Sequence, residues 1–191
     1  RTIGKEIREF SPTRCVIVFD GEGGSLRRRK LFPAYKMNRT GKFKPKRPDG
    51  YELTEAEERE SMRWQLCRVQ KYLECLPVQV VIIDNIEADD TIAHLCSHFK
   101  SIANKIRIVS TDRDFLQLVS DQVEVYSPVK KKVYTPTDLT DEFGFHTANY
   151  LLYRTLTGDT SDNIPGIGGM GLKTMLKHFP EVIDADLVLE D

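Results

Sequence analysis

Short runs rich in valine and isoleucine alternate along this chain with longer segments of helical periodicity, and this alternation strongly constrains the fold. The runs lie at residues 15–19, 78–83, 106–109 and 123–126. Runs of this composition are typical of strands that are buried on both faces of a sheet. Strands that alternate with helices predict an α/β fold with a mostly parallel sheet flanked by helices.

The segments between the runs carry helix signals. Thr54 and Glu57 fit a capping box. The apolar residues of segment 62–76 repeat every three or four positions, so one face of that helix is apolar. We expect further helices over residues 89–99, from Phe115 onward, from an N-cap at Thr137 through Phe143, over 147–156 and over 172–179. Residues 40–50 are polar and basic with glycine and proline, which predicts a mobile loop.

Composition narrows the class of protein. The 191 residues suit one domain, or one domain plus part of another. No apolar run approaches the ~18 residues of a membrane span, and no signal peptide opens the chain. We therefore expect a cytoplasmic protein without a membrane span. The cysteines show no CxxC spacing and are interpreted as reduced, mostly buried thiols: Cys15, Cys67, Cys75 and Cys96.

The net charge of −1 hides an uneven distribution of charge. Basic residues follow one another from Leu26 to Arg47 without an intervening acid: Arg27, Arg28, Arg29, Lys30, Lys36, Arg39, Lys42, Lys44, Lys46 and Arg47. Such a stretch suits contact with a polyanion, and a solvated charge run is the alternative interpretation. Lys36 and Arg39 would share one face of a helical turn, where they could clamp a phosphate, and Tyr35 could stack on a base. Without the acids, a core tyrosine beside exposed basic residues explains them equally well.

Carboxylates follow the predicted strands. Asp20 follows the first run, a group around Glu87 follows the second, and Asp112 begins a group after the third. Sites in open α/β sheets form beyond the carboxyl ends of the strands, so these acids should converge on one rim. The full set is Asp20, Glu87, Asp89, Asp90, Asp112 and Asp114, which Asp159 and Asp162 can join. Mutual repulsion would raise their pKa values unless hard cations such as Mg²⁺ or Mn²⁺ compensate. Two such ions ~4 Å apart can activate water against a phosphodiester. Each acid taken alone could instead cap a helix or complement its N-terminus.

The stretch GDTSDNIPGIGGMGLKT, residues 158–174, follows its two aspartates with a glycine-rich turn. The turn has the pattern of a helix–hairpin–helix, in which glycines such as Gly169 and Gly171 permit positive φ angles and expose backbone N–H groups to a phosphate. Lys173 and Thr174 add charge and a hydroxyl. An ordinary tight connection is the alternative. The spacing does not match a P-loop.

Two histidines and the tryptophan are weaker candidates for functional residues. His94 and His98 have the spacing of a zinc pair, but the apolar residues of segment 92–99 define the buried face, so both histidines should point outward. Trp64 is expected to pack in or beside the long helix. We assign neither a metal site nor a functional role to these three residues.

Taken together, the motifs resemble the 5′-nuclease family, which includes phage flap endonucleases and the 5′→3′ exonuclease domain of bacterial DNA polymerase I. The matching pieces are VFDGEG, RRRKLFPAYKMNR, EADD, STDRDF and GDTSDNIPGIGGMGLKT, in the family's order. The resemblance implies a PIN-like nuclease fold with a helical arch and a C-terminal helix–hairpin–helix. It implies metal ligation by the acids named above, phosphate contacts from Lys36 and Arg39, and K⁺ binding by the hairpin. We assign catalysis to Lys36, Arg39, Asp20, Asp112 and Asp114, and DNA contact to the basic residues, Tyr35 and the glycine-rich turn.

The resemblance also suggests domains and alternatives. We expect a nuclease core over 1–135, with an arch at about 36–76, and a hairpin region over 136–191. The family begins with a strand that ends in another metal-binding aspartate, so we expect that this core lacks its first strand and that the hairpin region is cut short. The expected partner of this monomer is DNA with a 5′ flap, a branch or a 5′ end. The alternatives are a non-catalytic DNA-binding remnant and a PIN-type ribonuclease.

Overall fold

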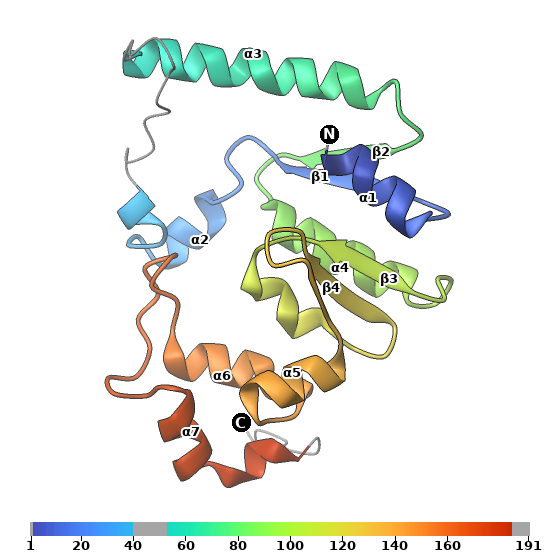
Figure 1. Cartoon of the computed structure of the whole chain (residues 1–191). Coiled ribbons are helices and arrows are strands. Elements are labelled where there is room, and N and C mark those ends of the chain that lie inside the picture. Colours follow the sequence, from blue (N-terminus) through green and yellow to red (C-terminus); the bar gives the residue numbers. More distant parts are fainter. Residues whose placement is uncertain (1, 40–52, 185–191) are drawn as a thin grey trace. The chain divides into compact units, whose positions relative to one another are not determined.

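The computed structural model describes residues 2–39 and 53–184, which belong to two compact units (Figure 1). The first unit comprises Arg1–Arg27 and Thr40–Ala88, and the second comprises Arg28–Arg39 and Asp89–Asp191. Each unit has helices and a small sheet of its own. The predicted α/β class is therefore confirmed, whereas the described strands form two sheets instead of the single sheet expected.

The first unit contains a parallel pair of strands and two helices. Its elements are α1 (Thr2–Phe10), β1 (Val16–Asp20), α3 (Glu55–Leu73) and β2 (Gln79–Ile83). Asp20 pairs with Ile83 at the carboxyl end of this sheet. The predicted capping box begins α3: the Thr54 hydroxyl accepts the Glu57 N–H, and the Glu57 carboxylate accepts the Thr54 N–H.

Apolar side chains of the first unit remain exposed. Val80, Ile82 and Ile83 of β2 are about two-fifths exposed, so the expectation that β2 is buried on both faces is wrong. A sheet of two strands offers too little area to form a buried layer. On α3 the apolar stripe exists, but of its members only Leu73 is buried. Trp64 is 65% exposed and its ring lies beside the Arg68 guanidinium, so the expected packing of Trp64 is also wrong.

The second unit is built on a three-stranded sheet. β3 (Ile106–Val109) runs parallel to β4 (Val123–Ser127), which pairs antiparallel with β5 (Lys132–Tyr134). Every residue of β4 is buried, as a central strand requires. The hydrophobic core of this unit surrounds β4 and includes Ile108, Phe115, Val123, Val125, Leu139, Phe145, Tyr150 and Met175. β5 was not predicted, because its three residues carry a lysine and only one aliphatic side chain.

Helices surround this sheet. They are α4 (Ala88–Phe99), α5 (Pro136–Phe143), α6 (Tyr150–Thr157) and α7 (Leu172–His178), with short 3₁₀ segments η1 (Met37–Arg39), η2 (Arg113–Leu118), η3 (Thr147–Asn149) and η4 (Pro180–Ile183). α2 (Leu26–Leu31) spans the point where the chain passes from the first unit to the second. The helix expected over 147–156 begins as the 3₁₀ turn η3, whereas the helix expected from Phe115 is wrong, because η2 is 3₁₀ over its whole length and ends at Leu118.

The N-cap expected at Thr137 is wrong, because Thr135 occupies that position. The Thr135 hydroxyl accepts the Asp138 N–H, and Pro136 fills the first helical position, where its missing N–H costs nothing. At the other end of α5, Gly144 adopts a φ of 75° and closes the helix.

Two further expectations concern exposure. His94 and His98 on α4 are exposed, as predicted. The cysteines are not mostly buried: Cys96 is buried, Cys15 is half-buried, and Cys67 and Cys75 are exposed. Within the described residues, none of the helices is both long and apolar enough to cross a membrane.

Candidate active site

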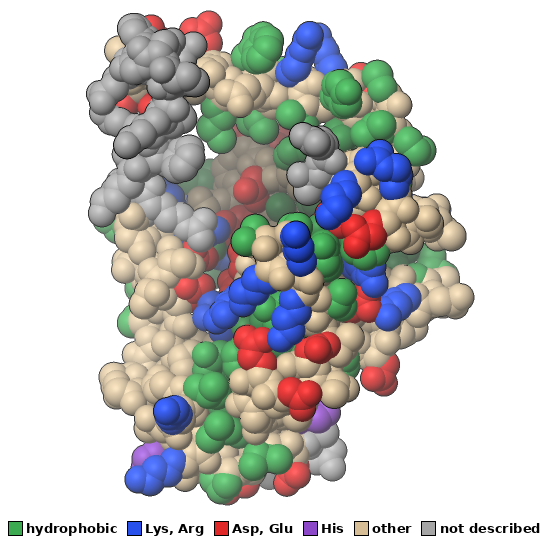
Figure 2. All heavy atoms as spheres, in the orientation of Figure 1, with side chains coloured by type: hydrophobic (Ala, Val, Ile, Leu, Met, Phe, Trp, Pro, Cys, Tyr) green, Lys and Arg blue, Asp and Glu red, His purple; other side chains and the backbone are tan. Residues whose placement is uncertain are grey.

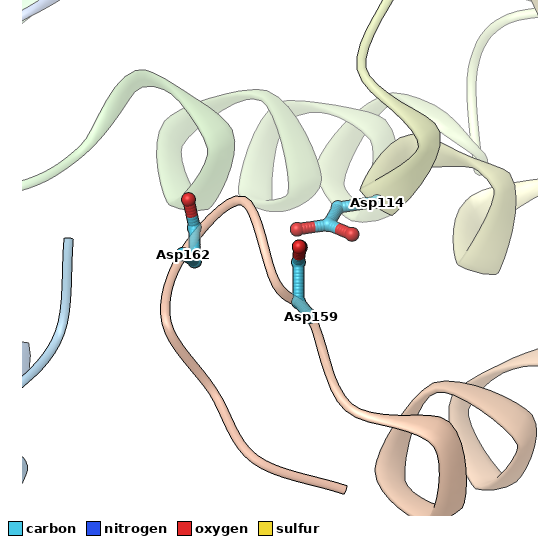
Figure 3. A group of neighbouring side chains, drawn as sticks. All are labelled: Asp114, Asp159 and Asp162. Carbon is cyan, nitrogen blue, oxygen red and sulfur yellow. The ribbon is translucent and has the colours of Figure 1, made fainter. Parts of the chain in front are cut away.

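Three aspartates of the second unit meet at one point (Figure 3). Asp114 lies in η2, directly after β3, and Asp159 and Asp162 lie in the connection that follows α6. One carboxylate oxygen from each lies within 4.8 Å of the others. We call these residues the acidic cluster. Such a set of hard oxygen donors fits a cation like Mg²⁺ or Mn²⁺.

Local backbone structure fixes Asp159 within this cluster. Asp159 and Ile164 form an antiparallel bridge, with N–H to carbonyl distances of 2.8 and 2.7 Å. The Asp159 carboxylate accepts both the N–H and the hydroxyl of Ser161 at 2.7 Å. Gly158 has a φ of 71°, and a Cβ added to it would lie 2.3 Å from the Gly166 nitrogen. The tight turn around the aspartates therefore requires a glycine at 158.

Arg154 in the last turn of α6 contacts two members of the cluster. Its Nη2 lies 2.8 Å from Asp114 Oδ1 and 2.5 Å from Asp159 Oδ2. Burial raises the pKa of Asp114, against the opposing charge of Arg154, and Asp112 and Asp159 raise it further. The pKa of Asp159 is lowered: burial opposes this, but the hydrogen bonds from Ser161 and the charge of Arg154 outweigh burial. Arg154 was not predicted from the sequence, where its signal is a basic residue about one helical turn before GDTSD.

A turn at Lys36 is attached to the acidic cluster. Lys36 has a φ of 55°, its N–H donates to the Asp162 carbonyl at 2.9 Å, and its Nζ lies 3.9 Å from Asp162 Oδ2. Two side-chain amides complete the attachment: Asn38 donates to the Thr160 carbonyl at 2.7 Å, and Asn163 donates to the Ala34 carbonyl at 2.8 Å. Neither asparagine was singled out from the sequence.

Tyr35 lies beneath this lysine. The ring is 6% exposed, and the Lys36 Nζ lies 4.8 Å from its centroid. This burial favours the interpretation of Tyr35 as a core residue that supports Lys36 over the interpretation as a base-stacking platform. Arg39 ends η1, whereas Lys42, Lys44 and Lys46, with the expected mobile loop, lie outside the described residues.

A cleft of about 480 Å³ in the second unit joins several of these side chains. It is lined by Arg28, Leu31, Phe32, Tyr35, Asp89, Asp90, Ala93, Asp114, Phe115, Gln117, Leu118, Asp162 and Ile164. Asp89 and Asp90 occupy the first turn of α4, which suits the helix dipole. Arg28 forms a bidentate pair with Asp90, with distances of 2.8 and 2.7 Å.

The remaining acids have other local roles. Asp20 and Glu87 belong to the first unit, where the Asp20 carboxylate accepts the Ala88 N–H at 2.7 Å and Glu87 is 4% exposed. Asp112 caps η2 by accepting the Asp114 N–H at 2.9 Å, which was the structural alternative for this residue. The structure thus brings Asp114, Asp159 and Asp162 together. Asp89 and Asp90 line the same cleft as Asp114 and Asp162.

The glycine-rich turn joins α6 to α7. Gly169 has a φ of 78°, whereas Gly171 has a φ of −105° and caps α7, so the expectation that Gly171 needs a positive φ is wrong. A Cβ added at Gly168, Gly169 or Gly171 would meet no atom of residues 2–39 and 53–184 within 4 Å. Lys173 is exposed and Thr174 is partly exposed. Figure 2 shows acidic and basic side chains interspersed on the face it presents, consistent with the small net charge.

The second unit thus holds the acidic cluster on an α/β framework. A family model described as the 5′-3′ exonuclease, N-terminal resolvase-like domain matches residues 1–144. The chain belongs to this 5′-3′ exonuclease family.

Relatives agree with this assignment. The chain is 32% identical over 185 residues to a 5′-3′ exonuclease of Aquifex aeolicus. The matched region covers 97% of this chain and 58% of that protein. It is 33% identical over 181 residues to the thermostable DNA polymerase I of Thermus filiformis, covering 95% of this chain and 19% of the polymerase. The chain therefore spans little more than half of the first relative and a fifth of the second.

Solved structures show a similar fold. A bacteriophage T5 flap endonuclease in a complex with DNA and metal ions superposes with a TM-score of 0.76 at 22% identity, covering 96% of this chain and 65% of that one. The T5 5′-exonuclease with bound zinc gives the same score and coverage.

Proposed function

We propose that this chain carries the nuclease site of a metal-dependent 5′ nuclease that hydrolyses phosphodiesters in DNA as a 5′→3′ exonuclease or flap endonuclease. The observation that carries the proposal is the acidic cluster with a lysine beside it: three carboxylates within 4.8 Å and the Lys36 Nζ 3.9 Å from Asp162. Family membership and the DNA and metal ions named for the T5 flap endonuclease support it.

Each group of side chains has a proposed task. Asp114, Asp159 and Asp162, with Asp20, Glu87, Asp89, Asp90 and Asp112, would hold two divalent cations, Mg²⁺ or Mn²⁺. When bound, these cations would supply Lewis acidity for attack by water on phosphorus and for departure of the leaving oxygen. The Lys36 ammonium, with Arg39, would stabilise negative charge that develops on the scissile phosphate. The attachment of the Lys36 turn to residues 160–163 would keep this ammonium beside the acids.

DNA binding is proposed to use two further regions. The first is the basic stretch, with Arg27, Lys42, Lys44 and Lys46, of which the three lysines belong to the proposed helical arch. The second is the proposed helix–hairpin–helix, where backbone N–H groups around Gly169 and Gly171, with Lys173 and Thr174, would contact duplex phosphates and the hairpin carbonyls would bind K⁺. The open space at these glycines supports the idea, because no contact with the described residues requires the absence of a side chain at 168 or 171.

The test is cleavage of a 5′-labelled flap DNA by this chain in Mg²⁺. We expect product in Mg²⁺ and none in EDTA. Asp159→Asn should lower the single-turnover rate by about 100-fold or more, whereas Asp141→Asn, a matched change on the exposed face of α5, should not. Tight DNA binding without cleavage would favour the non-catalytic alternative, and cleavage of RNA alone would favour the ribonuclease.

A further inference from the structure

One guanidinium nitrogen bridges two carboxylates of the acidic cluster. The Arg154 Nη2 contacts Asp114 Oδ1 at 2.8 Å and Asp159 Oδ2 at 2.5 Å. The other oxygen of Asp159, Oδ1, already accepts two hydrogen bonds from Ser161. Arg154 contacts the second oxygen, Oδ2, of a carboxylate that its own loop also holds.

The bridge joins η2 to the end of α6, since Arg154 and Asp114 lie 40 positions apart in the sequence and Arg154 and Asp159 lie 5 apart. Arg154 extends from α6, Asp114 belongs to η2, and Asp159 lies beyond the end of α6. The Arg154 side chain is 23% exposed and that of Asp159 is 15% exposed, so solvent screens the contact only in part. A charge-assisted contact of this kind holds two like-charged carboxylates together in the absence of any other cation.

We infer that Arg154 is a positioning residue that acts as the counter-ion of Asp114 and Asp159 in the metal-free protein, and that a divalent cation must displace its guanidinium to bind both carboxylates. The inference rests on the proposed function, because it requires that these acids bind metal. A divalent cation bound at the same pair of oxygens would lie close to the guanidinium, and the two positive charges would repel each other. The free energy of the contact between Arg154 and the two carboxylates is therefore lost when the cation binds, and this loss weakens cation binding.

A structural role for Arg154 would change metal affinity in the opposite direction. If Arg154 were only a structural tether that aligns the carboxylates for metal, its removal would weaken metal binding. If Arg154 competes with metal, its removal strengthens metal binding and destabilises the metal-free protein. Metal affinity therefore separates the two roles without any measurement of cleavage.

The experiment is a calorimetric titration of Mn²⁺ into wild type, Arg154→Gln and Arg154→Lys, with thermal unfolding of each protein in EDTA and in Mn²⁺. Glutamine removes the charge but keeps a hydrogen-bond donor, and lysine keeps the charge as a single ammonium that cannot reproduce the planar fork. Arg107→Gln is the matched control, since Arg107 pairs with Glu124 on β4 and Lys105 remains to pair with that carboxylate.

We expect Arg154→Gln to bind Mn²⁺ about tenfold more tightly than wild type, which corresponds to roughly 1.4 kcal/mol. We expect its Tm to be lower in EDTA and its rise in Tm on adding Mn²⁺ to be larger. The Mn²⁺ affinity of Arg154→Lys should lie between those of wild type and Arg154→Gln. Arg107→Gln should bind Mn²⁺ as wild type does.

Equal or weaker Mn²⁺ binding by Arg154→Gln, with a wild-type circular dichroism spectrum, would overturn the inference and leave the proposed function intact. If Arg154→Gln did not fold, Arg154→Lys would decide, and affinity no higher than that of wild type would count against competition. Failure of the wild type itself to bind Mn²⁺ would overturn both the inference and the proposed metal site.

Discussion

Lys36 is the residue whose surroundings most resemble those of a catalytic cation. Its left-handed backbone, the Tyr35 ring beneath it and the nearby Asp162 carboxylate restrict its ammonium, and its side chain is only 14% exposed. A cation held in place before substrate arrives stabilises developing negative charge without reorganising. Lys36 is therefore expected to act on the chemical step more than on affinity.

Lys36→Ala should lower the single-turnover cleavage rate by about 100-fold while changing the Kd for DNA much less. Quench-flow cleavage and fluorescence anisotropy, with Ca²⁺ in place of Mg²⁺ for binding, measure the two separately. Lys130→Ala is the control, because Lys130 also lies over a tyrosine ring but on the connection between β4 and β5. Loss of affinity at an unchanged rate would show that Lys36 only binds substrate.

Ionisation of Asp114 should destabilise the metal-free protein, whereas ionisation of Asp159 should stabilise it. The folded-state pKa of Asp114 is raised, so its ionised form costs stability at pH values above that pKa. The folded-state pKa of Asp159 is lowered, so its ionised form adds stability that is present above the ordinary aspartate pKa of about 3.9 and is lost as the pH falls through the folded-state value.

In EDTA at pH 7, Asp114→Asn should therefore raise the Tm and Asp159→Asn should lower it. Both differences should shrink toward pH 3, where the wild-type carboxyls take up protons. Differential scanning calorimetry across this pH range checks the prediction. A shift of both variants in the same direction at pH 7 would contradict the opposite pKa directions.

At the scale of elements, the connection from α6 to α7 contains glycines of two kinds. A Cβ at Gly166 would lie 2.3 Å from the Thr157 carbonyl carbon, so this glycine allows two backbone segments to touch. A Cβ at Gly171 would meet no atom of the described residues within 4 Å, and the φ of Gly171 suits any residue. Only the first kind is required by the fold.

Gly166→Ala should therefore lower the Tm by several degrees, since the clash is with backbone and cannot be relieved by a side-chain rotation. Gly171→Val should leave the Tm nearly unchanged but weaken duplex binding by about tenfold, if the turn approaches a phosphate closely. Thermal unfolding and duplex binding in Ca²⁺ test both variants. Wild-type duplex affinity in Gly171→Val would remove the turn from the DNA interface.

The elements show where sequence patterns are informative. The four strands that were predicted begin and end within one residue of the predicted runs, because runs rich in valine and isoleucine favour strands. Such runs do not by themselves report burial, as the exposed side chains of β2 show. β5 carries no such run, and η2 and η3 have apolar spacings that do not distinguish a 3₁₀ turn from the start of an α-helix. Asp114 was predicted from its place after a strand, and Asp159 and Asp162 from their place before the glycine-rich turn. Asn38 and Asn163 could not be predicted, since each contacts a segment that only the fold brings near, and the same holds for the contact of Arg154 with Asp114.

At the scale of the whole molecule, the uneven distribution of charge along the chain explains how a protein with a small negative net charge could bind DNA. The net charge is −1, yet the basic residues from Arg27 to Arg47 are not interrupted by an acid. Phosphate contacts made by such residues release counterions, so they set the salt dependence of binding more than its sequence preference.

Replacing Lys42, Lys44 and Lys46 together with alanine should weaken DNA binding and reduce the slope of log K against log[salt] by up to about 0.9 for each duplex phosphate that these lysines neutralise. The single-turnover rate at saturating DNA should change little. Binding measured over a series of KCl concentrations gives the slope. An unchanged slope would mean that these lysines do not bind phosphate.

The central claim is that the acidic cluster binds the divalent cation that cleavage requires. Anomalous diffraction from crystals of this chain grown with Mn²⁺ tests it most directly, because the scattering peak locates the cation independently of activity. We predict a peak within coordination distance of carboxylate oxygens of Asp114, Asp159 and Asp162, with the Arg154 guanidinium displaced from them. A well-ordered cluster without a peak at saturating Mn²⁺, in a protein that cleaves DNA, would contradict the account.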